Sequence, residues 1–158
     1  MKWRREGSGH PEAEDRTGWL ADADPVEQGF VLMLRSWLDG PQAQAALWDA
    51  LVRSAGVTGA RRILACFEQL IDVLARSALR PFRRHATRCP CLGADEAALS
   101  GMVRAAARGR RAAAESHVRG LLREADLVEV VERAARLGMQ LDEAGAYPTT
   151  SREARTLH

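Results

Sequence analysis

The stretch TGARRILACFEQLIDVLARSAL, residues 58–79, decides the fold class. Its large apolar side chains recur at intervals of four, three and four residues, at Ile63, Phe67, Leu70 and Leu74. Because an α-helix completes a turn about every 3.6 residues, this spacing places all four on one face. The pattern predicts a long helix with one side facing a core, and Pro81 stops that helix.

Two further helices are predicted before this one. Asp24 is a suitable N-cap for the first, and Pro25 stands at its first helical position, where a missing N–H costs nothing. Gly40 ends that helix, and Pro41 opens the second, which runs to Gly56.

Three helices are predicted after residue 94. Asp95 is the expected cap of the first, and a second helix spans about 110–123. Asp126 and Glu129 have the spacing of a capping box for the third, which Gly138 is expected to end.

These patterns predict an all-α protein, a single compact bundle of five or six helices. No stretch alternates between apolar and polar residues as a half-buried strand would, and no repeat of 30 to 50 residues indicates a solenoid. We expect the helical domain to span residues 24–142. Residues 1–23 and 143–158 lack apolar periodicity and are expected to be flexible tails.

The 158 residues suffice for one domain with a core of its own. Three cysteines do not make a disulfide framework, and their number and close spacing suit a reducing compartment. The N-terminus turns acidic and polar where a signal peptide would be apolar. The longest apolar run, residues 30–34, is far short of the roughly 20 residues of a membrane span. We therefore expect a cytoplasmic protein that does not contact the membrane.

The stretch RRHATRCPCLGADE, residues 83–96, gathers three soft metal ligands within seven positions: His85, Cys89 and Cys91. If the turn after Pro81 is helical, His85 and Cys89 project from one face. Such a nitrogen and sulfur set suits Zn²⁺ or Fe, and Cys66 is a candidate fourth ligand. The C-x-C spacing is less common in zinc sites than C-x₂₋₄-C.

Two other interpretations of this stretch stay open. Cationic neighbours favour thiolates, so Cys89 and Cys91 are also candidates for a labile, regulatory disulfide. Alternatively the stretch is structural, with Pro90 and Gly93 shaping a connection and Asp95 capping the next helix.

Positive charge is concentrated in residues 73–114, which hold nine arginines against two carboxylates. Such a field can attract an acidic protein or a nucleic acid, although stacking aromatics are lacking. The candidate partner-binding residues are Arg80, Arg83, Arg84, Arg88, Arg108, Arg110 and Arg111.

The sequence contains no G-x-S-x-G, P-loop or G-x-G-x-x-G motif, which removes the common hydrolase and nucleotide-binding hypotheses. No catalytic residue is identified. We expect a small regulatory or accessory protein rather than an enzyme, with a metal or thiol-redox site at residues 85–91. The alternatives are a binding module that uses the arginine-rich segment, and a structural interaction domain that uses Trp37 and Trp48.

Overall fold

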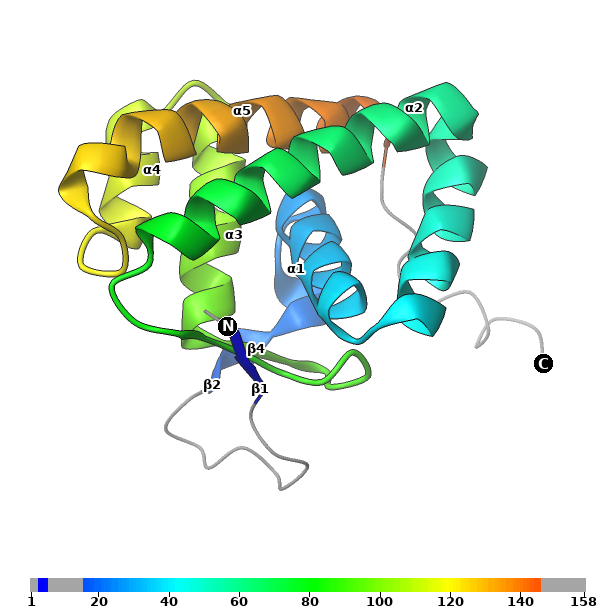
Figure 1. Ribbon diagram of the computed structural model, residues 1–158, viewed down its shortest axis with the longest axis horizontal. Helices are drawn as coiled ribbons and strands as arrows, with labels where there is room; N and C mark the ends of the chain where they lie inside the picture. The colour runs from blue at the N-terminus through cyan, green and yellow to red at the C-terminus, as the bar shows by residue number, and fades with distance from the viewer. Residues whose placement is uncertain (1–2, 6–15, 146–158) are drawn as a thin grey trace.

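The helices of the protein surround one hydrophobic core, which confirms the all-α class (Figure 1). The computed structural model describes residues 3–5 and 16–145. The remaining residues of the two predicted tails, 1–2, 6–15 and 146–158, lie outside the described part. The helices are α1 (Pro25–Leu38), α2 (Pro41–Ser77), α3 (Ala94–Ala107), α4 (Arg111–Val118) and α5 (Leu127–Glu143), with 3₁₀ turns at Leu20–Asp22 and Glu124–Asp126.

The predicted start of α1 is confirmed, and α2 contains both of the helices predicted around Gly56. Asp24 Oδ1 accepts a hydrogen bond from the Val26 N–H at 3.0 Å, and Glu27 accepts one from the Asp24 N–H at 3.1 Å. Gly56 has φ 71° and ψ 172°, a non-helical conformation within α2. The positive φ favours glycine, and the chain changes direction sharply there (Figure 1).

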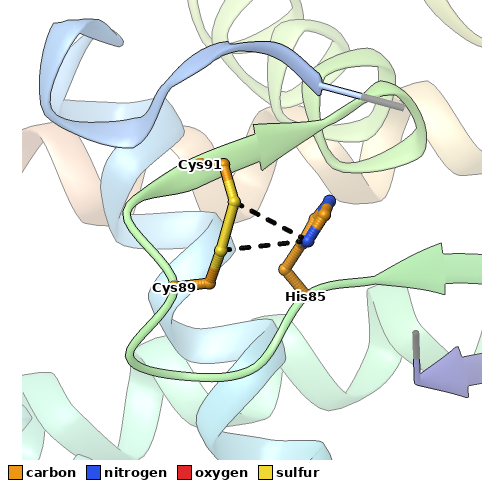
Figure 2. Close-up of side chains that lie close together, drawn as sticks. All are labelled: His85, Cys89 and Cys91. Atoms are coloured by element: carbon orange, nitrogen blue, oxygen red, sulfur yellow. Dashed lines mark hydrogen bonds between the residues drawn. A yellow bond between two sulfur atoms is a disulfide. The ribbon is translucent and has the colours of Figure 1, made fainter. Parts of the chain in front are cut away.

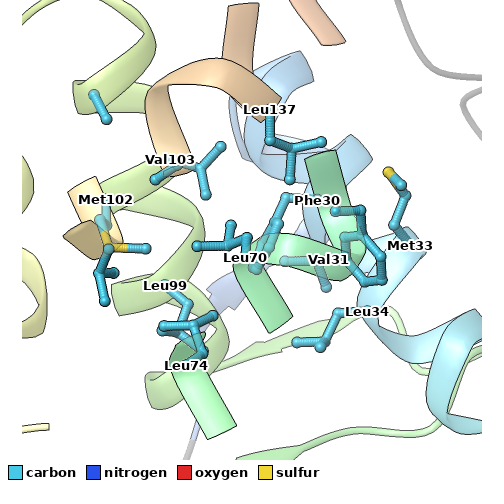
Figure 3. Packing of buried hydrophobic residues seen from close by; sticks show 14 of the residues in the cluster. Phe30, Val31, Met33, Leu34, Leu70, Leu74, Leu99, Met102, Val103 and Leu137 are labelled. Carbon is cyan, nitrogen blue, oxygen red and sulfur yellow. The ribbon is translucent and has the colours of Figure 1, made fainter. Parts of the chain in front are cut away.

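The core lies between α1, the second half of α2, α3 and α5 (Figure 3). All four apolar residues that define the 58–79 stripe are at most 1% exposed. The Phe67 ring packs against Phe30 at 6.3 Å and meets the edge of Trp37 at 5.9 Å between ring centroids. The longest predicted apolar face is therefore the centre of the bundle.

The C-terminal end of α5 differs from the predicted one. It continues through Gly138 to Glu143 instead of ending at the glycine. A Cβ on Gly138 would lie 2.6 Å from the Ala107 Cβ and 2.9 Å from the Val103 carbonyl oxygen on α3. The glycine therefore allows α3 and α5 to approach closely, and its role is packing.

The predicted capping box at Asp126 and Glu129 does not form. The Asp126 side chain makes no capping hydrogen bond and instead accepts from Arg123 Nε at 2.9 Å. Glu129 accepts from Arg76 at 2.7 Å, which joins α5 to α2. The predicted helix over 110–123 is also shorter, because α4 ends at Val118.

Four short strands were not predicted: β1 (Trp3–Arg5), β2 (Arg16–Trp19), β3 (Phe82–Arg84) and β4 (Cys91–Gly93). β1 pairs in parallel with β3, and β2 pairs antiparallel with β4. Strands β1 and β2, which belong to the predicted N-terminal tail, thus pair with the two strands in the connection between α2 and α3. Each strand has only three or four residues, too few for an alternating pattern to be recognised.

The Trp3 ring packs on Phe82 with 4.8 Å between ring centroids, so β1 also contributes an aromatic side chain to this end of the molecule.

Among the described residues, no helix has the length and apolar character needed to cross a membrane.

Replacing Gly138 by Ala should lower the free energy of unfolding by about 1–3 kcal/mol, because the added methyl forces α3 away from α5. In an open helix interior the same change would raise stability by about 1 kcal/mol, so the sign of the effect is diagnostic. Urea denaturation measures it. Glu132→Ala, on the exposed side of α5, is the control and should change stability by less than about 0.5 kcal/mol. A stabilising Gly138→Ala change would contradict the close approach.

Candidate redox and metal site

The connection between β3 and β4 brings together the three predicted soft ligands. His85 directly follows β3, Cys89 lies in the loop, and Cys91 begins β4. The segment is not helical, so the helical geometry considered for His85 and Cys89 is wrong. A turn closed by a 2.9 Å hydrogen bond from the Cys89 N–H to the Ala86 carbonyl reverses the chain instead.

Cys89 and Cys91 form a disulfide, with their Cα atoms 5.5 Å apart (Figure 2). His85 points at this bond, with its Nδ1 at 3.9 Å from Cys89 Sγ and 3.8 Å from Cys91 Sγ. The donor atoms of the three residues all lie within 4.8 Å of one another, so the group could hold a metal ion. His85 and Cys91 are buried, while Cys89 is partly exposed.

A fully buried ion pair fixes the loop to the rest of the fold. Arg35 on α1 and Glu96 on α3 form a bidentate pair, with Nε to Oε1 and Nη2 to Oε2 both at 2.7 Å. Both side chains are 0% exposed. Arg35 also donates to the carbonyl oxygens of Cys89 and Cys91, each at 2.7 Å. One guanidinium therefore binds the backbone of both cysteines.

Glu96 completes the attachment from the other side of the loop. Its carboxylate accepts hydrogen bonds from the backbone N–H groups of His85 and Gly93, each at 3.1 Å. The His85 ring also covers Gly93, since a Cβ there would lie 2.7 Å from ring atoms Cδ2 and Nε2. The backbone on both sides of the disulfide is thus bound to one buried charge pair.

Asp95 is not the predicted helix cap, because the N-cap position of α3 belongs to Gly93. Its carboxylate instead accepts two hydrogen bonds from Arg80 and one from the Arg83 N–H, all at 2.8 Å. Burial raises the pKa of the Asp95 carboxyl, whereas these hydrogen bonds lower it, and the net pKa lies below the ordinary value of 3.8.

Several of the seven arginines proposed to bind a partner form ion pairs within the described part of the fold. Arg80 pairs with Asp95, Arg84 with Asp39, Arg108 with Asp24 and Arg111 with Glu115. Arg84 is itself buried. The side chains of Arg83, Arg88 and Arg110 are exposed. Much of the positive charge near the loop is therefore balanced within the fold.

Cys66, the candidate fourth ligand, is a free cysteine on α2 that packs partly buried against the hydrophobic core. It does not belong to the group formed by His85, Cys89 and Cys91. Within the described part of the chain, that group therefore has three protein ligands.

Sequence reasoning missed the Arg35–Glu96 pair. A signal for half of it exists, because Arg35 lies four residues after Val31 and therefore on a face of α1 that is buried. A charged residue in such a position needs a partner. Nothing in the sequence indicates that this partner is Glu96, 61 residues further on.

No family model, curated protein or solved structure matches this chain. The arrangement supports two chemical states of one group: a closed disulfide, and an open dithiol beside an imidazole. The thiolate form of cysteine is the metal ligand, so only the open state offers sulfur ligands to an ion.

Replacing Glu96 by Gln should lower the free energy of unfolding by about 3–5 kcal/mol, since it leaves the Arg35 guanidinium buried without its counter-charge. The Arg35→Met/Glu96→Met double variant should lose less stability than the sum of the losses in Arg35→Met and Glu96→Met, because both charges are removed together. Urea denaturation of the full cycle measures the coupling.

The exposed pair between Arg76 and Glu129 provides the matched control for that cycle. Glu129→Gln should cost much less than Glu96→Gln, because solvent screens this pair. Equal costs for Glu96→Gln and Glu129→Gln would contradict the importance of the buried pair.

The stability contributed by Asp95 should depend on pH in the acid range. Because the folded-state pKa of this carboxyl lies below 3.8, its contribution is present above pH 3.8 and is lost as the pH falls through the folded value. Urea unfolding between pH 7 and pH 2 should show a shallower loss for Asp95→Asn than for the wild type. Arg80→Gln, which removes the main cause of the lowered pKa, should also flatten the curve. Parallel curves for all three proteins would show that the prediction is wrong.

Proposed function

We propose that the protein is a small regulatory or accessory protein that alternates between a disulfide state and a metal-bound dithiol state at His85, Cys89 and Cys91. One observation carries this proposal. The two sulfurs are already bonded to each other, and an imidazole nitrogen lies within 3.9 Å of both. A loop built only as a connection has no need for this convergence of three soft donors.

The proposed change between the two states is a balanced two-electron step. A dithiol reductant supplies two electrons and two protons, breaks the Cys89–Cys91 bond and becomes a disulfide itself. A divalent ion then displaces a proton from each thiol and binds the two thiolates and the imidazole. Zn²⁺ or Fe²⁺ suits such a donor set.

Three protein ligands leave a fourth position on a tetrahedral ion for water or for a ligand from elsewhere. An open position is typical of ions that react or exchange, whereas closed four-ligand sites are structural. We therefore assign the ion a regulatory role, in a reducing compartment such as the cytoplasm where the disulfide can be opened.

Hydrogen bonds from the loop connect the proposed change at the disulfide to the helices. A metal ion between the two thiolates needs them farther apart than a covalent bond allows. The loop backbone must adjust, and the carbonyl groups of Cys89 and Cys91 are bound to Arg35 on α1. The Arg35–Glu96 pair would transmit the adjustment to α1 and α3, the helices that carry its two charges.

Metal titration of the reduced protein tests the proposal. Wild-type protein reduced and handled without oxygen should bind about one Zn²⁺ per chain, and Co²⁺ in its place should give a thiolate charge-transfer band. The oxidised wild type and the Cys89→Ser/Cys91→Ser variant should bind none.

Cys66→Ser is the matched control, because it removes a thiol that lies outside the group, and it should bind metal as the wild type does. Counting of thiols before and after mild oxidation should show the loss of two thiols in the wild type. Absence of stoichiometric metal from the reduced protein, or absence of a reversible disulfide, would refute the proposed function.

A further inference from the structure

The two sulfurs of the disulfide differ in how they are enclosed. Cys91 is 4% exposed and begins β4, where it pairs with Trp19 of β2. Next to it, the Leu20 N–H donates to the Pro90 carbonyl at 2.9 Å, which holds the N-terminal segment against this part of the loop. Cys89 is partly exposed and stands between two exposed residues, Arg88 and Pro90.

We propose that Cys89 is the attachment site of an external thiol and that Cys91 is the leaving and resolving cysteine. This inference rests on the proposed function, since it describes how the same disulfide is opened. It assigns the two cysteines separate roles on the basis of their enclosure. The external reactant is an aliphatic thiolate, from either a small thiol or a protein.

The reaction forms one sulfur–sulfur bond and breaks another. The attacking thiolate bonds to Cys89 Sγ, and the electron pair of the Cys89–Cys91 bond leaves with Cys91 Sγ as a thiolate. A second external thiolate then attacks the sulfur of the first external thiol in the mixed disulfide on Cys89. The two external sulfurs leave as a disulfide, and Cys89 is released as a thiolate. Two electrons have moved from the external thiols to the protein.

Access decides which sulfur is attacked, because the incoming thiolate must approach in line with the bond that breaks. An approach to Cys91 Sγ is obstructed by the pairing of β4 with β2 and by the burial of the strand. Cys89, by contrast, is a partly exposed residue of the turn, and β2 does not pair with it, so its sulfur is easier to approach.

The burial of Cys91 also favours its role as the resolving cysteine. Its sulfur lies 3.8 Å from His85 Nδ1, and its carbonyl stays bound to Arg35, so the released thiolate remains in place. From there it is positioned to attack the mixed disulfide on Cys89 and restore the original bond. Exposed Arg88, next to Cys89, adds a positive charge that favours an anionic thiol.

The first experiment uses the oxidised full-length wild type and reduced glutathione. The reaction is quenched with acid at short times, free thiols are alkylated, and the chain is digested with trypsin. Cleavage after Arg88 and Arg104 puts both cysteines on one peptide that excludes Cys66, and fragmentation between Cys89 and Pro90 separates them. We expect glutathione on Cys89 and the alkyl group on Cys91, in at least about a tenfold excess over the reverse.

The second experiment compares two matched variants that both lack the disulfide, Cys66→Ser/Cys91→Ser and Cys66→Ser/Cys89→Ser. Reaction with oxidised glutathione should be at least about tenfold faster for the variant that retains Cys89. A reduced dithiol protein of the thioredoxin type, used with the oxidised wild type, distinguishes a protein thiol from a small thiol as the faster reactant. Either result is consistent with attachment at Cys89.

Predominant attachment at Cys91, or equal rates for the two variants, would overturn this inference and leave the proposed function intact. A wild type that forms no reversible disulfide would refute the proposed function instead, and the paired variants would still report which cysteine is accessible. If the variants do not fold, the wild-type peptide measurement decides the question alone.

Discussion

The buried pair between Arg35 and Glu96 is the constraint on which the site depends. Two opposite charges with no solvent exposure are expensive to desolvate, and their attraction compensates only when the remaining hydrogen-bonding groups are also satisfied. Here they are satisfied by the loop, through two cysteine carbonyls on Arg35 and two backbone N–H groups on Glu96. The loop and the ion pair therefore require each other, and the pair specifies the position of the disulfide more than it adds to overall stability.

The strands supply a second level of support around this pair. Neither short sheet would be stable alone, because a two-stranded ribbon of three or four residues is marginal in water. Each one is anchored to a helix: Asp95 of α3 accepts from the Arg83 N–H on β3, and Arg35 of α1 donates to the Cys91 carbonyl on β4. The result is a disulfide placed between the N-terminal segment and the bundle. The elements in contact with it lie far apart in the sequence.

Helix prediction succeeded where local patterns act alone. The apolar stripe over residues 58–79, the cap at Asp24 and the break at Gly56 all follow from the helical period and from the conformational preferences of single residues. The failures share a different cause. Gly138 has the composition of a helix end, yet it serves the contact of α5 with α3. Asp95 has the composition of a cap, yet arginines from the preceding loop bind it. In each case a tertiary partner replaced the local role.

The sequence by itself determined the helical class, the principal helices and the three soft donors between residues 85 and 91, because periodicity and side-chain chemistry are properties of neighbouring residues. Only the tertiary structure decided that these donors converge without Cys66, that most of the nearby arginines are paired inside the fold, and that one cysteine is more enclosed than the other. Those outcomes depend on Arg35, Glu96 and the strand pairing of residues 16–19, which joins segments as distant along the chain as Arg16 and Gly93. Contacts at that separation are set by packing, and no local pattern records them.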